Sequence, residues 1–361
     1  MKNKIVCIHL FNNYTGSPKI LMQVIDALKI VGYEVDLITN KSEGFLSNIS
    51  GIHYRYIFYQ WKKNKLVTLF YFIFSQIQLF FIITKNYRQD NTILYINTIT
   101  PIGAAIAGKL FKKKIIYHVH EKYIAANMLH KTCQFVYEKI PCYSIFVSKY
   151  LQESYPKKSK KSSIVYNTLE KTFKDISNDY LEKRTLKSNT ILMVCSLRSF
   201  KGIYEFVELS KLLPLYNFEL VLSAPENEVE IFKQGNFLIK NLSVFGSQIN
   251  LHPFYQRAKL LLNLSDSNLW IETFGLTILE AMEYGIPSIV PKAGGPKELV
   301  SDCYNGYLIN SKELNEIKEK IDCMMKDENL YDYFSKNAIL KAKDFDNDKM
   351  ASKIIGIIEN M

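Results

Sequence analysis

The sequence predicts two α/β domains, each a doubly wound parallel sheet, that face each other across a cleft. The chain has 361 residues, of which 48% are apolar, so it is too long for one ordinary core and has enough apolar side chains to fill two. Strand-like and helix-like segments alternate along it, which indicates parallel sheets. The alternation runs as two series, separated by a polar and charged stretch over 171–189.

The first series predicts the N-terminal domain, residues 1–170. Short β-branched and aromatic runs indicate strands, and apolar residues spaced by three or four indicate helices. Gly16, His120, Ser148 and Asn167 follow predicted strands, where the ligand-binding loops of parallel sheets lie. We expect strands at 4–10, 33–39, 52–58, 92–97, 114–120, 143–148 and 164–167, a polar loop at 12–18, and helices at 19–31 and 101–111.

The second series predicts the C-terminal domain, residues 190–343, after a linker over 171–189. From residue 311 the pattern is helical to the end of the chain. The last segment, 344–361, is expected to be a helix that packs back towards the N-terminal domain. Strands are expected at 190–196, 218–223, 242–245, 260–264 and 288–291, and a helix at 203–213.

The net charge of +11 predicts an anionic partner. The sequence contains neither zinc-finger spacing nor a recognisable nucleic-acid module, so we expect no nucleic acid. An anionic membrane surface is the alternative partner, because clustered lysines bind anionic lipids. The clusters all lie in the first half of the chain: Lys62, Lys63 and Lys65; Lys112, Lys113 and Lys114; and Lys157, Lys158, Lys160 and Lys161.

The predicted location is the cytoplasm, with possible peripheral contact to the inner face of the cell membrane. The six cysteines are scattered and form no CxxC pair, which indicates a reducing compartment and no structural zinc. The start of the chain resembles a strand after a polar beginning, without a secretory signal. The apolar stretch 66–85 has the length of about 20 residues that a membrane span needs. Its polar Ser75, Gln76 and Gln78 favour a helix of the domain, in contact with the membrane or buried.

The stretch 270–296 contains a predicted binding site for an anionic, hydroxylated ligand. Thr273 can cap a helix that begins near Phe274 or Gly275, and a glycine and a proline end that helix. Two carboxylates frame it: Glu272 precedes the helix and Glu280 lies within it. The first amides of a helix have no internal acceptor and carry partial positive charge, so they favour an anion.

Two cations lie at the end of the predicted strand 190–196. Arg198 and Lys201 flank a short turn that should lie beside the helix beginning near Gly275. Both side chains are suited to a phosphate bound at that helix. The spacing therefore predicts a diphosphate site in the C-terminal domain.

These motifs resemble those of the family 4 glycosyltransferases, which have the GT-B fold of two Rossmann-like domains. In that family two glutamates are separated by seven residues, as Glu272 and Glu280 are here. The resemblance covers nearly the whole chain, because Gly16-Ser17, His120, Ser148 and Val165-Tyr-Asn167 match the weaker N-terminal pattern. The matching C-terminal segments are Arg198, Lys201-Gly202, Glu272-Thr-Phe-Gly-Leu-Thr-Ile-Leu-Glu280-Ala-Met, Gly285-Ile-Pro287, Gly294-Gly295-Pro-Lys-Glu298 and Asn305-Gly306-Tyr-Leu.

The resemblance implies a retaining transfer of a sugar from a nucleotide diphosphate sugar to an acceptor hydroxyl. It implies that Arg198 and Lys201 neutralise the leaving diphosphate, where charge builds as the glycosidic bond breaks. It assigns the hydroxyls of the donor sugar to Glu272 and the ribose to Glu280. His120 would contact the donor sugar near the reacting carbon.

The same resemblance implies that backbone amides bind the donor. These amides belong to Phe274, Gly275, Leu276 and Thr277, which would face the sugar and the phosphates. Gly16 and Ser17 would bring the N-terminal loop close to the donor, since glycine allows close backbone approach. No enzyme nucleophile is implied, so the two carboxylates are not expected to form the acid and base of a hydrolase.

The chain departs from the family pattern at two places. Ser-Ala-Pro-Glu follows the predicted strand 218–223, where the family often has a glycine-rich turn that contacts the base. The loop between Ser265 and Glu272 is longer than usual, which affects donor choice. We favour a UDP-sugar, with a GDP-sugar as the alternative, and a saccharide or lipid-linked acceptor of cell-surface polysaccharide or glycolipid synthesis.

Two other functions remain open at this point: a noncatalytic GT-B module that binds a polyanion or a partner subunit, and a sugar-nucleotide epimerase. We expect neither a cofactor nor a metal. The Asp-x-Asp patterns at Asp344, Asp346 and Asp348 resemble those of metal-dependent transferases, but they lie at a predicted helix start, which favours capping. The histidines show no metal-binding spacing.

Overall fold

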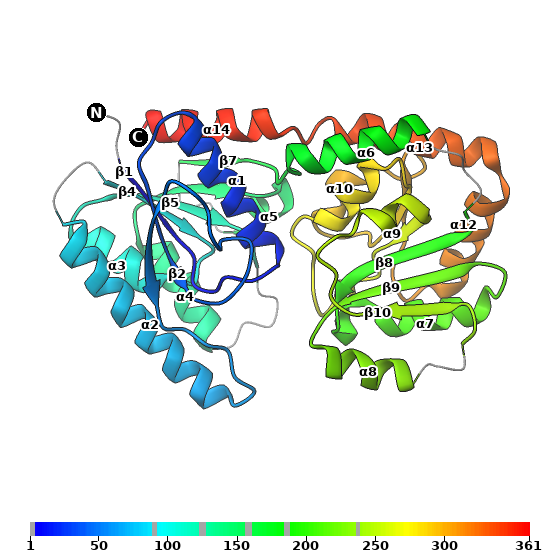
Figure 1. Ribbon diagram of the computed structural model, residues 1–361, viewed down its shortest axis with the longest axis horizontal. Helices are drawn as coiled ribbons and strands as arrows, with labels where there is room; N and C mark the ends of the chain where they lie inside the picture. Colours follow the sequence, from blue (N-terminus) through cyan, green and yellow to red (C-terminus); the bar gives the residue numbers. More distant parts are fainter. Residues whose placement is uncertain (1–3, 89–91, 123–127, 156–160, 184–187, 236–238) are drawn as a thin grey trace. The chain divides into compact units, whose positions relative to one another are not determined.

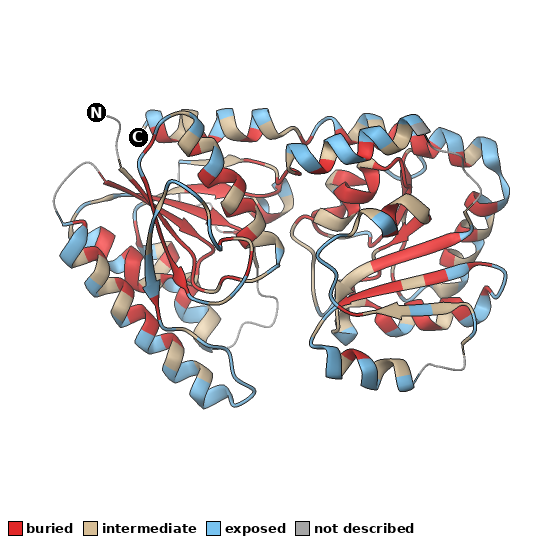
Figure 2. Cartoon of the chain, viewed as in Figure 1, coloured by how far each residue is buried: buried red, intermediate tan, exposed pale blue. Residues whose placement is uncertain are grey.

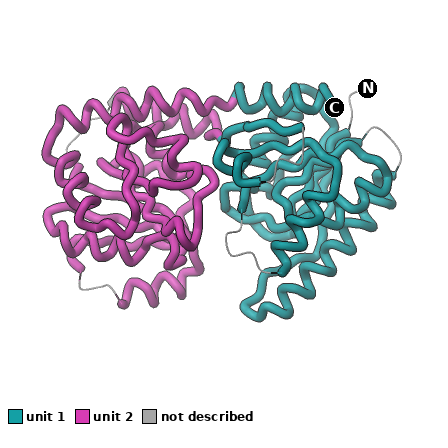
Figure 3. Tube along the Cα trace, turned by 180° about the vertical axis from the view of Figure 1, so that it is seen from behind, with its two compact units in different colours: residues 1–167, 348–361 teal, residues 168–347 magenta. Residues whose placement is uncertain are grey.

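The structure, a computed structural model, describes the chain except residues 1–3, 89–91, 123–127, 156–160, 184–187 and 236–238. Lys157, Lys158 and Lys160 of the third predicted lysine cluster therefore lie outside the described residues. The chain forms two compact units (Figure 3). Unit 1 comprises residues 1–167 and 348–361, and unit 2 comprises residues 168–347.

Unit 1 is built on a seven-stranded sheet in the order β3-β2-β1-β4-β5-β6-β7, and each pair of neighbours is parallel (Figure 1). The order reverses direction between β1 and β4, which therefore form the topological switch point of this sheet. The strands are β1 (Lys4–Ile8), β2 (Val35–Asn40), β3 (His53–Ile57), β4 (Thr92–Asn97), β5 (Lys114–Val119), β6 (Tyr143–Phe146) and β7 (Ser162–Ile164).

Helices cover both faces of this sheet. Because parallel crossovers are right-handed, α1, which leads to β2, lies on the face opposite to α2 and α3, which lead to β4 and β5. The helices of unit 1 are α1 (Gly16–Ile30), α2 (Lys65–Asn86), α3 (Ile102–Leu110), α4 (Met128–Lys139), α5 (Lys149–Ser154) and most of α14 (Asn347–Glu359).

The beginning of α1 differs from the prediction. Gly16 and Ser17 were expected in a loop, but both lie in the first turn of α1. Pro18 is compatible with this position, because the first amides of a helix have no internal partner and proline lacks an amide hydrogen.

Unit 2 is built on a six-stranded parallel sheet in the order β10-β9-β8-β11-β12-β13. Its switch point lies between β8 and β11. The strands are β8 (Thr190–Ser196), β9 (Asn217–Ser223), β10 (Leu242–Phe245), β11 (Ala258–Leu262), β12 (Ser288–Val290) and β13 (Gly306–Leu308).

The stretch 171–189, expected as a linker, instead contains a helix of unit 2, α6 (Lys171–Lys183). Its aromatic residues pack on the unit, since the ring of Phe173 lies 6.2 Å from Tyr255 and that of Tyr180 lies 5.5 Å from Tyr284. The other helices are η1 (Ser199–Lys201), α7 (Ile203–Leu212), α8 (Glu226–Gln234), α9 (His252–Arg257), α10 (Leu276–Glu283), α11 (Pro296–Leu299), α12 (Leu314–Lys326) and α13 (Glu328–Ala342).

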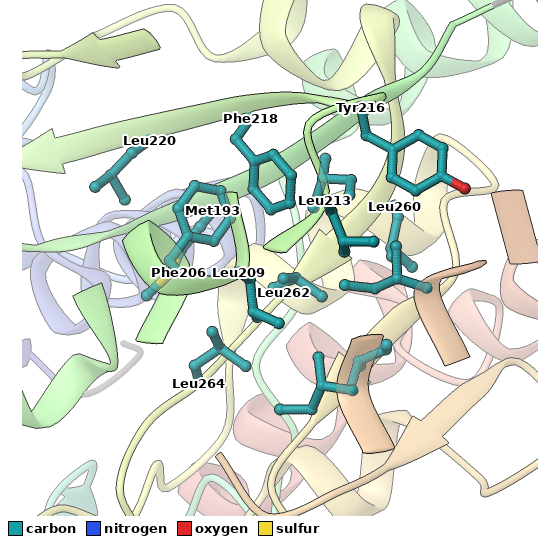
Figure 4. Packing of buried hydrophobic residues seen from close by; sticks show 14 of the residues in the cluster. Met193, Phe206, Leu209, Leu213, Tyr216, Phe218, Leu220, Leu260, Leu262 and Leu264 are labelled. Atoms are coloured by element: carbon teal, nitrogen blue, oxygen red, sulfur yellow. The ribbon is translucent and has the colours of Figure 1, made fainter. Parts of the chain in front are cut away.

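The core of unit 2 fills the space between this sheet and the helices that follow its strands. Phe206 of α7 lies edge to face with Phe218 of β9, at 5.2 Å between ring centroids (Figure 4). Leu260 and Leu262 of β11 belong to the same buried cluster. This packing fixes the positions of β8 and β11, whose carboxyl ends carry the predicted site.

One helix in the described part of the chain, α2, is long and apolar enough to cross a membrane by length and composition. Only 28% of its most apolar window is buried within the structure. One side of α2 nevertheless packs within unit 1, as Figure 2 shows by the buried residues along it.

Candidate active site

The predicted cations of unit 2 lie at its switch point. β8 ends at Ser196 beside β11, and the loop after β8 carries Arg198 and Lys201. Arg198 is exposed, whereas Lys201 is half-buried. Ligands of doubly wound sheets bind in the crevice at such a point. The sequence therefore located these two cations correctly relative to the sheet.

Gly202 sets the position of Lys201. It follows η1 in the left-handed conformation, with a φ of +82°, and begins α7. A Cβ atom added there would lie 2.2 Å from the carbonyl oxygen of Leu264, two residues after β11. Only glycine permits both the backbone conformation and this close approach. The turn therefore holds Lys201 close to the end of β11.

Lys201 and Glu272 form an ion pair, which joins the two predicted motifs. Their side chains are 15% and 20% exposed, so the pair is largely, but not fully, shielded from solvent. Ser265 donates a hydrogen bond from Oγ to Glu272 Oε1 at 3.2 Å. The Lys201 ammonium also lies 5.2 Å from the centre of the Trp270 ring, at cation-π distance.

Two glycines bring the chain near Glu272. The amide of Gly295 donates to the carbonyl oxygen of Glu272 at 2.8 Å. A Cβ atom on Gly294 would lie 2.4 Å from that same oxygen, and one on Gly295 would lie 2.3 Å from the carbonyl oxygen of Thr273. The Gly-Gly-Pro motif therefore acts by close backbone packing against the loop that carries Glu272.

The helix between the two glutamates begins later than predicted. Gly275 is its N-cap residue, in a left-handed conformation with a φ of +110°, and no side chain caps it. Thr273, the expected cap, precedes the N-cap position by two residues. The amides of Leu276 and Thr277 then lie in the first turn, where an α-helix supplies no acceptor. Phe274 is buried, with its ring 5.6 Å from Phe345, so its side chain serves the core.

Glu280 is buried inside unit 2. Its Oε2 accepts a hydrogen bond from the hydroxyl of Tyr255 at 2.7 Å. Burial raises the pKa of Tyr255 well above its usual range, with a further contribution from the charge of Glu280, so the phenol stays protonated and continues to donate. Sequence reasoning had not singled out Tyr255, because nothing in the pattern of α9 marks it as a partner of a residue in α10.

A second group of polar residues lies at the switch point of unit 1. Ile8 of β1 pairs with Ile96 of β4, so His9 and Asn97 follow at neighbouring positions. Asn97 donates from Nδ2 to His9 Nδ1 at 3.1 Å and to the carbonyl oxygen of Ser17 at 3.0 Å. His120 donates from Nε2 to Asn97 Oδ1 at 2.8 Å. Asn97 thus connects His120 to the first turn of α1, although the sequence marked it only as the end of a strand.

Burial keeps the histidines of this group neutral. It lowers the pKa of His9 to about 4 and that of His118 to about 3. The pKa of His120 falls well below its usual range, first by burial and then by electrostatic coupling to the nearby His118 and His9. The imidazole of His120 is therefore a hydrogen-bonding group and not a cation. Glu121 behaves in the opposite sense, since burial raises its pKa to about 7.

We expect the free energy of unfolding of unit 1 to fall as the pH is lowered below about 6.5. The unfolded chain binds a proton on each histidine near that pH, whereas the native state binds it near pH 4 at His9 and near pH 3 at His118. Each buried histidine then contributes a slope of about 1.4 kcal/mol per pH unit. Glu121 offsets the slope of one histidine. Its raised pKa stabilises the fold at low pH, and this stabilisation is lost as the pH rises to about 7.

Urea unfolding at pH 8, 7, 6 and 5 measures this dependence. His118→Gln should reduce the slope below pH 6.5, since Gln cannot bind the proton. An identical slope for wild type and His118→Gln would show that this histidine is not held neutral by the fold.

Three side chains in unit 1 have a spacing that suits a metal ion. Glu34, Asp36 and His53 offer ligand atoms within 4.8 Å of one another. Lys4 already places its ammonium 2.7 Å from Glu34 and 3.2 Å from Asp36. The hydrogen bond with Glu34 is the main reason why the pKa of Lys4 is raised. A cation thus already neutralises these carboxylates, and nothing else about the cluster calls for a metal.

Residues 178–341, which cover nearly all of unit 2, match the family model of the glycosyl transferases group 1. These residues belong to that family. The chain is also 25% identical over 273 residues to an uncharacterised glycosyltransferase of Methanocaldococcus jannaschii, and the match covers 72% of each protein. The predicted group 1 type is therefore confirmed for residues 178–341, and the predicted class of enzyme, a hexosyl-type glycosyltransferase, is confirmed.

Another relative is the N,N'-diacetylbacillosaminyl-diphospho-undecaprenol α-1,3-N-acetylgalactosaminyltransferase of Campylobacter jejuni. It is 25% identical over 180 residues, which cover 48% of this chain and 46% of that protein. The crystal structure of Anabaena HepE in complex with UDP and glucose has a TM-score of 0.81 and 18% identity over 100% of both chains. The chain therefore has the predicted GT-B fold, with a parallel-sheet α/β unit in each half.

Proposed function

We propose that this group 1 enzyme is a retaining family 4 glycosyltransferase. It moves a hexosyl group from a nucleotide diphosphate sugar, preferably a UDP-sugar, to a hydroxyl of a saccharide or lipid-linked acceptor in the synthesis of cell-surface polysaccharide or glycolipid. The observation that carries the proposal is the Lys201–Glu272 ion pair at the switch point of unit 2. It joins a shielded cation to the carboxylate of Glu272, four residues before α10 begins.

Lys201 is suited to the leaving diphosphate. Negative charge builds on the diphosphate as the glycosidic bond breaks, and a fixed cation in a partly dry site stabilises that charge more strongly than one in water. The first-turn amides of α10 add partial positive charge nearby. Arg198 supplies a second cation on the same loop, and its exposed guanidinium is free to move onto a phosphate.

The two glutamates bind hydroxyls in this proposal. Glu272 shares its carboxylate with Lys201 and Ser265, which orient its oxygens as acceptors for the hydroxyls of the donor sugar. Glu280, fixed by Tyr255, is assigned to the hydroxyls of the ribose. Each carboxylate already has a partner, Lys201 for Glu272 and Tyr255 for Glu280, so neither is assigned the role of a glycosidase acid.

The polar residues at the switch point of unit 1 are assigned to the same reaction. His120 is neutral and oriented by Asn97, so it can contact the donor sugar by a hydrogen bond without adding charge. Gly16 and Ser17 lie in the first turn of α1, whose amides suit the polar edge of the donor. The preference for a UDP-sugar is supported by HepE, which was solved with UDP and glucose. The lipid-linked acceptor is supported by the name of the Campylobacter jejuni relative.

A panel of nucleotide sugars tests the proposal on the wild-type enzyme. Thermal shifts with UDP-, GDP- and ADP-sugars and the free nucleotides identify the donor, and release of the nucleotide with a saccharide or lipid-linked acceptor measures transfer. We expect the largest shift and acceptor-dependent release with a UDP-sugar, and the α configuration of the donor kept in the product. No shift with any donor would favour a noncatalytic module. Epimerised sugar without an acceptor would favour the epimerase.

A further inference from the structure

Helix α2 has an exposed apolar face in addition to the face that packs within unit 1. Phe72, Leu79 and Ile83 are buried on the inner side. The outer side exposes large apolar residues spaced by three or four, so that they form one stripe. The stripe, called here the outer face of α2, consists of Leu66, Phe70, Ile73, Phe74, Ile77 and Phe81. Figure 2 shows exposed and half-buried positions along this side of the helix.

The inner side of α2 is held firmly against α3. A Cβ atom on Gly103 would lie 2.0 Å from the backbone oxygen of Gln76, so the two helices touch backbone to backbone. The amide of Gly103 donates to Gln76 Oε1 at 3.0 Å. Crossing a bilayer would separate these helices and place Gln76 and Gln78 in hydrocarbon. The fold therefore favours a helix that stays in unit 1 and presents only its outer face.

The segment around α2 contains cations and no carboxylates. Between Glu43 and Asp90 the sequence has no acidic residue, but it has Arg55, Lys62, Lys63, Lys65, Lys85 and Arg88. Lys62, Lys63 and Lys65 are exposed at the amino end of the outer face. Thr68 fixes this loop on the helix, because its Oγ1 accepts from the amide of Lys62 at 2.9 Å and donates to the carbonyl oxygen of Lys62 at 2.8 Å.

Aromatic rings extend the outer face onto the segment before α2. Phe58 packs edge to face with Phe74 at 6.4 Å between centroids, and Phe70 stacks on Phe74 at 6.4 Å. Trp61, next to the lysines, is 57% exposed. Aromatic and aliphatic side chains beside lysines are the composition of helices that lie in a membrane interface.

We propose that the outer face of α2 docks unit 1 on an anionic lipid bilayer, with the helix axis in the plane of the interface. The apolar side chains enter the boundary between headgroups and acyl chains, and Lys62, Lys63 and Lys65 contact anionic headgroups. A second copy of this chain is a poorer occupant, because a symmetric dimer through this face would bring like charges together. The proposal does not depend on the donor or the acceptor of the transfer reaction.

Vesicle binding by the full-length protein tests this inference. Co-sedimentation is measured with vesicles of phosphatidylcholine alone and with vesicles that contain phosphatidylglycerol, at low and high salt. We expect binding only to the anionic vesicles and weaker binding at high salt, where charges are screened. The triple variant K62Q/K63Q/K65Q should bind roughly a hundredfold more weakly, because each lysine contributes about a fivefold factor.

The apolar contribution is tested by Phe70→Ser together with Phe81→Ser, which are 64% and 63% exposed. This double variant should bind at least about tenfold more weakly, since two large apolar side chains no longer leave water. Ile30→Ser is the matched control, because Ile30 is 86% exposed on α1, on the opposite face of the sheet. It should bind as the wild type does, and circular dichroism and thermal melting confirm that all variants are folded.

Three outcomes would overturn the proposal. If the double phenylalanine variant bound vesicles as strongly as the wild type does, the outer face of α2 would not be part of the interaction. Resistance of the bound protein to both high salt and alkaline carbonate would show a spanning helix. A dimer in analytical ultracentrifugation that the phenylalanine variant dissociates, without vesicle binding, would show that a second copy covers this face.

Discussion

Replacing Lys201 with alanine is expected to lower kcat by roughly 100- to 1,000-fold, the loss typical of removing one group that stabilises developing charge. Lys201 is the shielded cation at the switch point of unit 2, and its ammonium is paired with Glu272. Without it, the leaving diphosphate loses a fixed positive charge and meets the uncompensated carboxylate of Glu272. Steady-state kinetics of nucleotide release, with the donor identified by the panel, measure the change.

A double variant separates the two causes of this loss. If repulsion of the diphosphate by Glu272 contributes, the double variant Lys201→Ala/Glu272→Gln should have a higher kcat than Lys201→Ala alone. Its kcat should still be below that of the wild type, because the cation is absent. Lys312→Ala is the control, because Lys312 also forms an ion pair in unit 2, with Glu205, but its side chain is 55% exposed. It should change kcat by less than about twofold, as expected for a surface pair. A kcat for Lys201→Ala within about twofold of the wild type would refute the role of Lys201 in leaving-group stabilisation.

Apart from β13 (Gly306–Leu308), which was not expected, the strands of the described residues could be predicted because each one is a short apolar run bounded by turn residues. All strands expected in both series are present, with ends within three residues of the expected ones. The positions of Arg198, Lys201 and His120 followed directly, since each lies just after such a run. The ion pair of Lys201 with Glu272 did not follow, because only the pairing of β8 with β11 brings the two loops together.

Other features depended on contacts between distant segments. The start of α10 was misplaced because Thr273 is a good cap by residue type, but the Gly294–Gly295 loop packs against the backbone of Glu272 and Thr273. Helix α6 was taken for a linker because it is mostly polar. Its few ring contacts with Tyr255 and Tyr284 stabilise it, and these partners lie far along the sequence.

Asn97 shows the same limit in the site itself. It is one of several polar residues at strand ends, and the sequence gives no reason to prefer it. The strand order, with β4 between β1 and β5, places Asn97 between His9 and His120. Which strands are neighbours is a property of the whole sheet and cannot be deduced from the pattern of one segment.

Gly202→Ala is expected to destabilise unit 2 by roughly 2 to 5 kcal/mol. The substitution combines two costs: a φ of +82°, which disfavours any residue with a Cβ atom, and a contact of 2.2 Å with the carbonyl oxygen of Leu264. The backbone strain accounts for about 1 to 2 kcal/mol, and the overpacking for another 1 to 3 kcal/mol. The variant should also bind the nucleotide more weakly, because relief of the clash moves the turn that carries Lys201.

Gly32→Ala isolates the first cost. Gly32 has nearly the same φ, +86°, but no atom lies within 4 Å of the added Cβ, so only the backbone strain of about 1 to 2 kcal/mol is expected. Because the two glycines lie in different units, hydrogen exchange of the β8 amides reports on Gly202→Ala and that of the β2 amides on Gly32→Ala. A larger loss of protection in β8 than in β2 would show that the approach of Leu264 fixes the Lys201 turn. Equal losses would mean that Gly202 is required only for its conformation, and that the turn has room to keep Lys201 in place when a side chain is added.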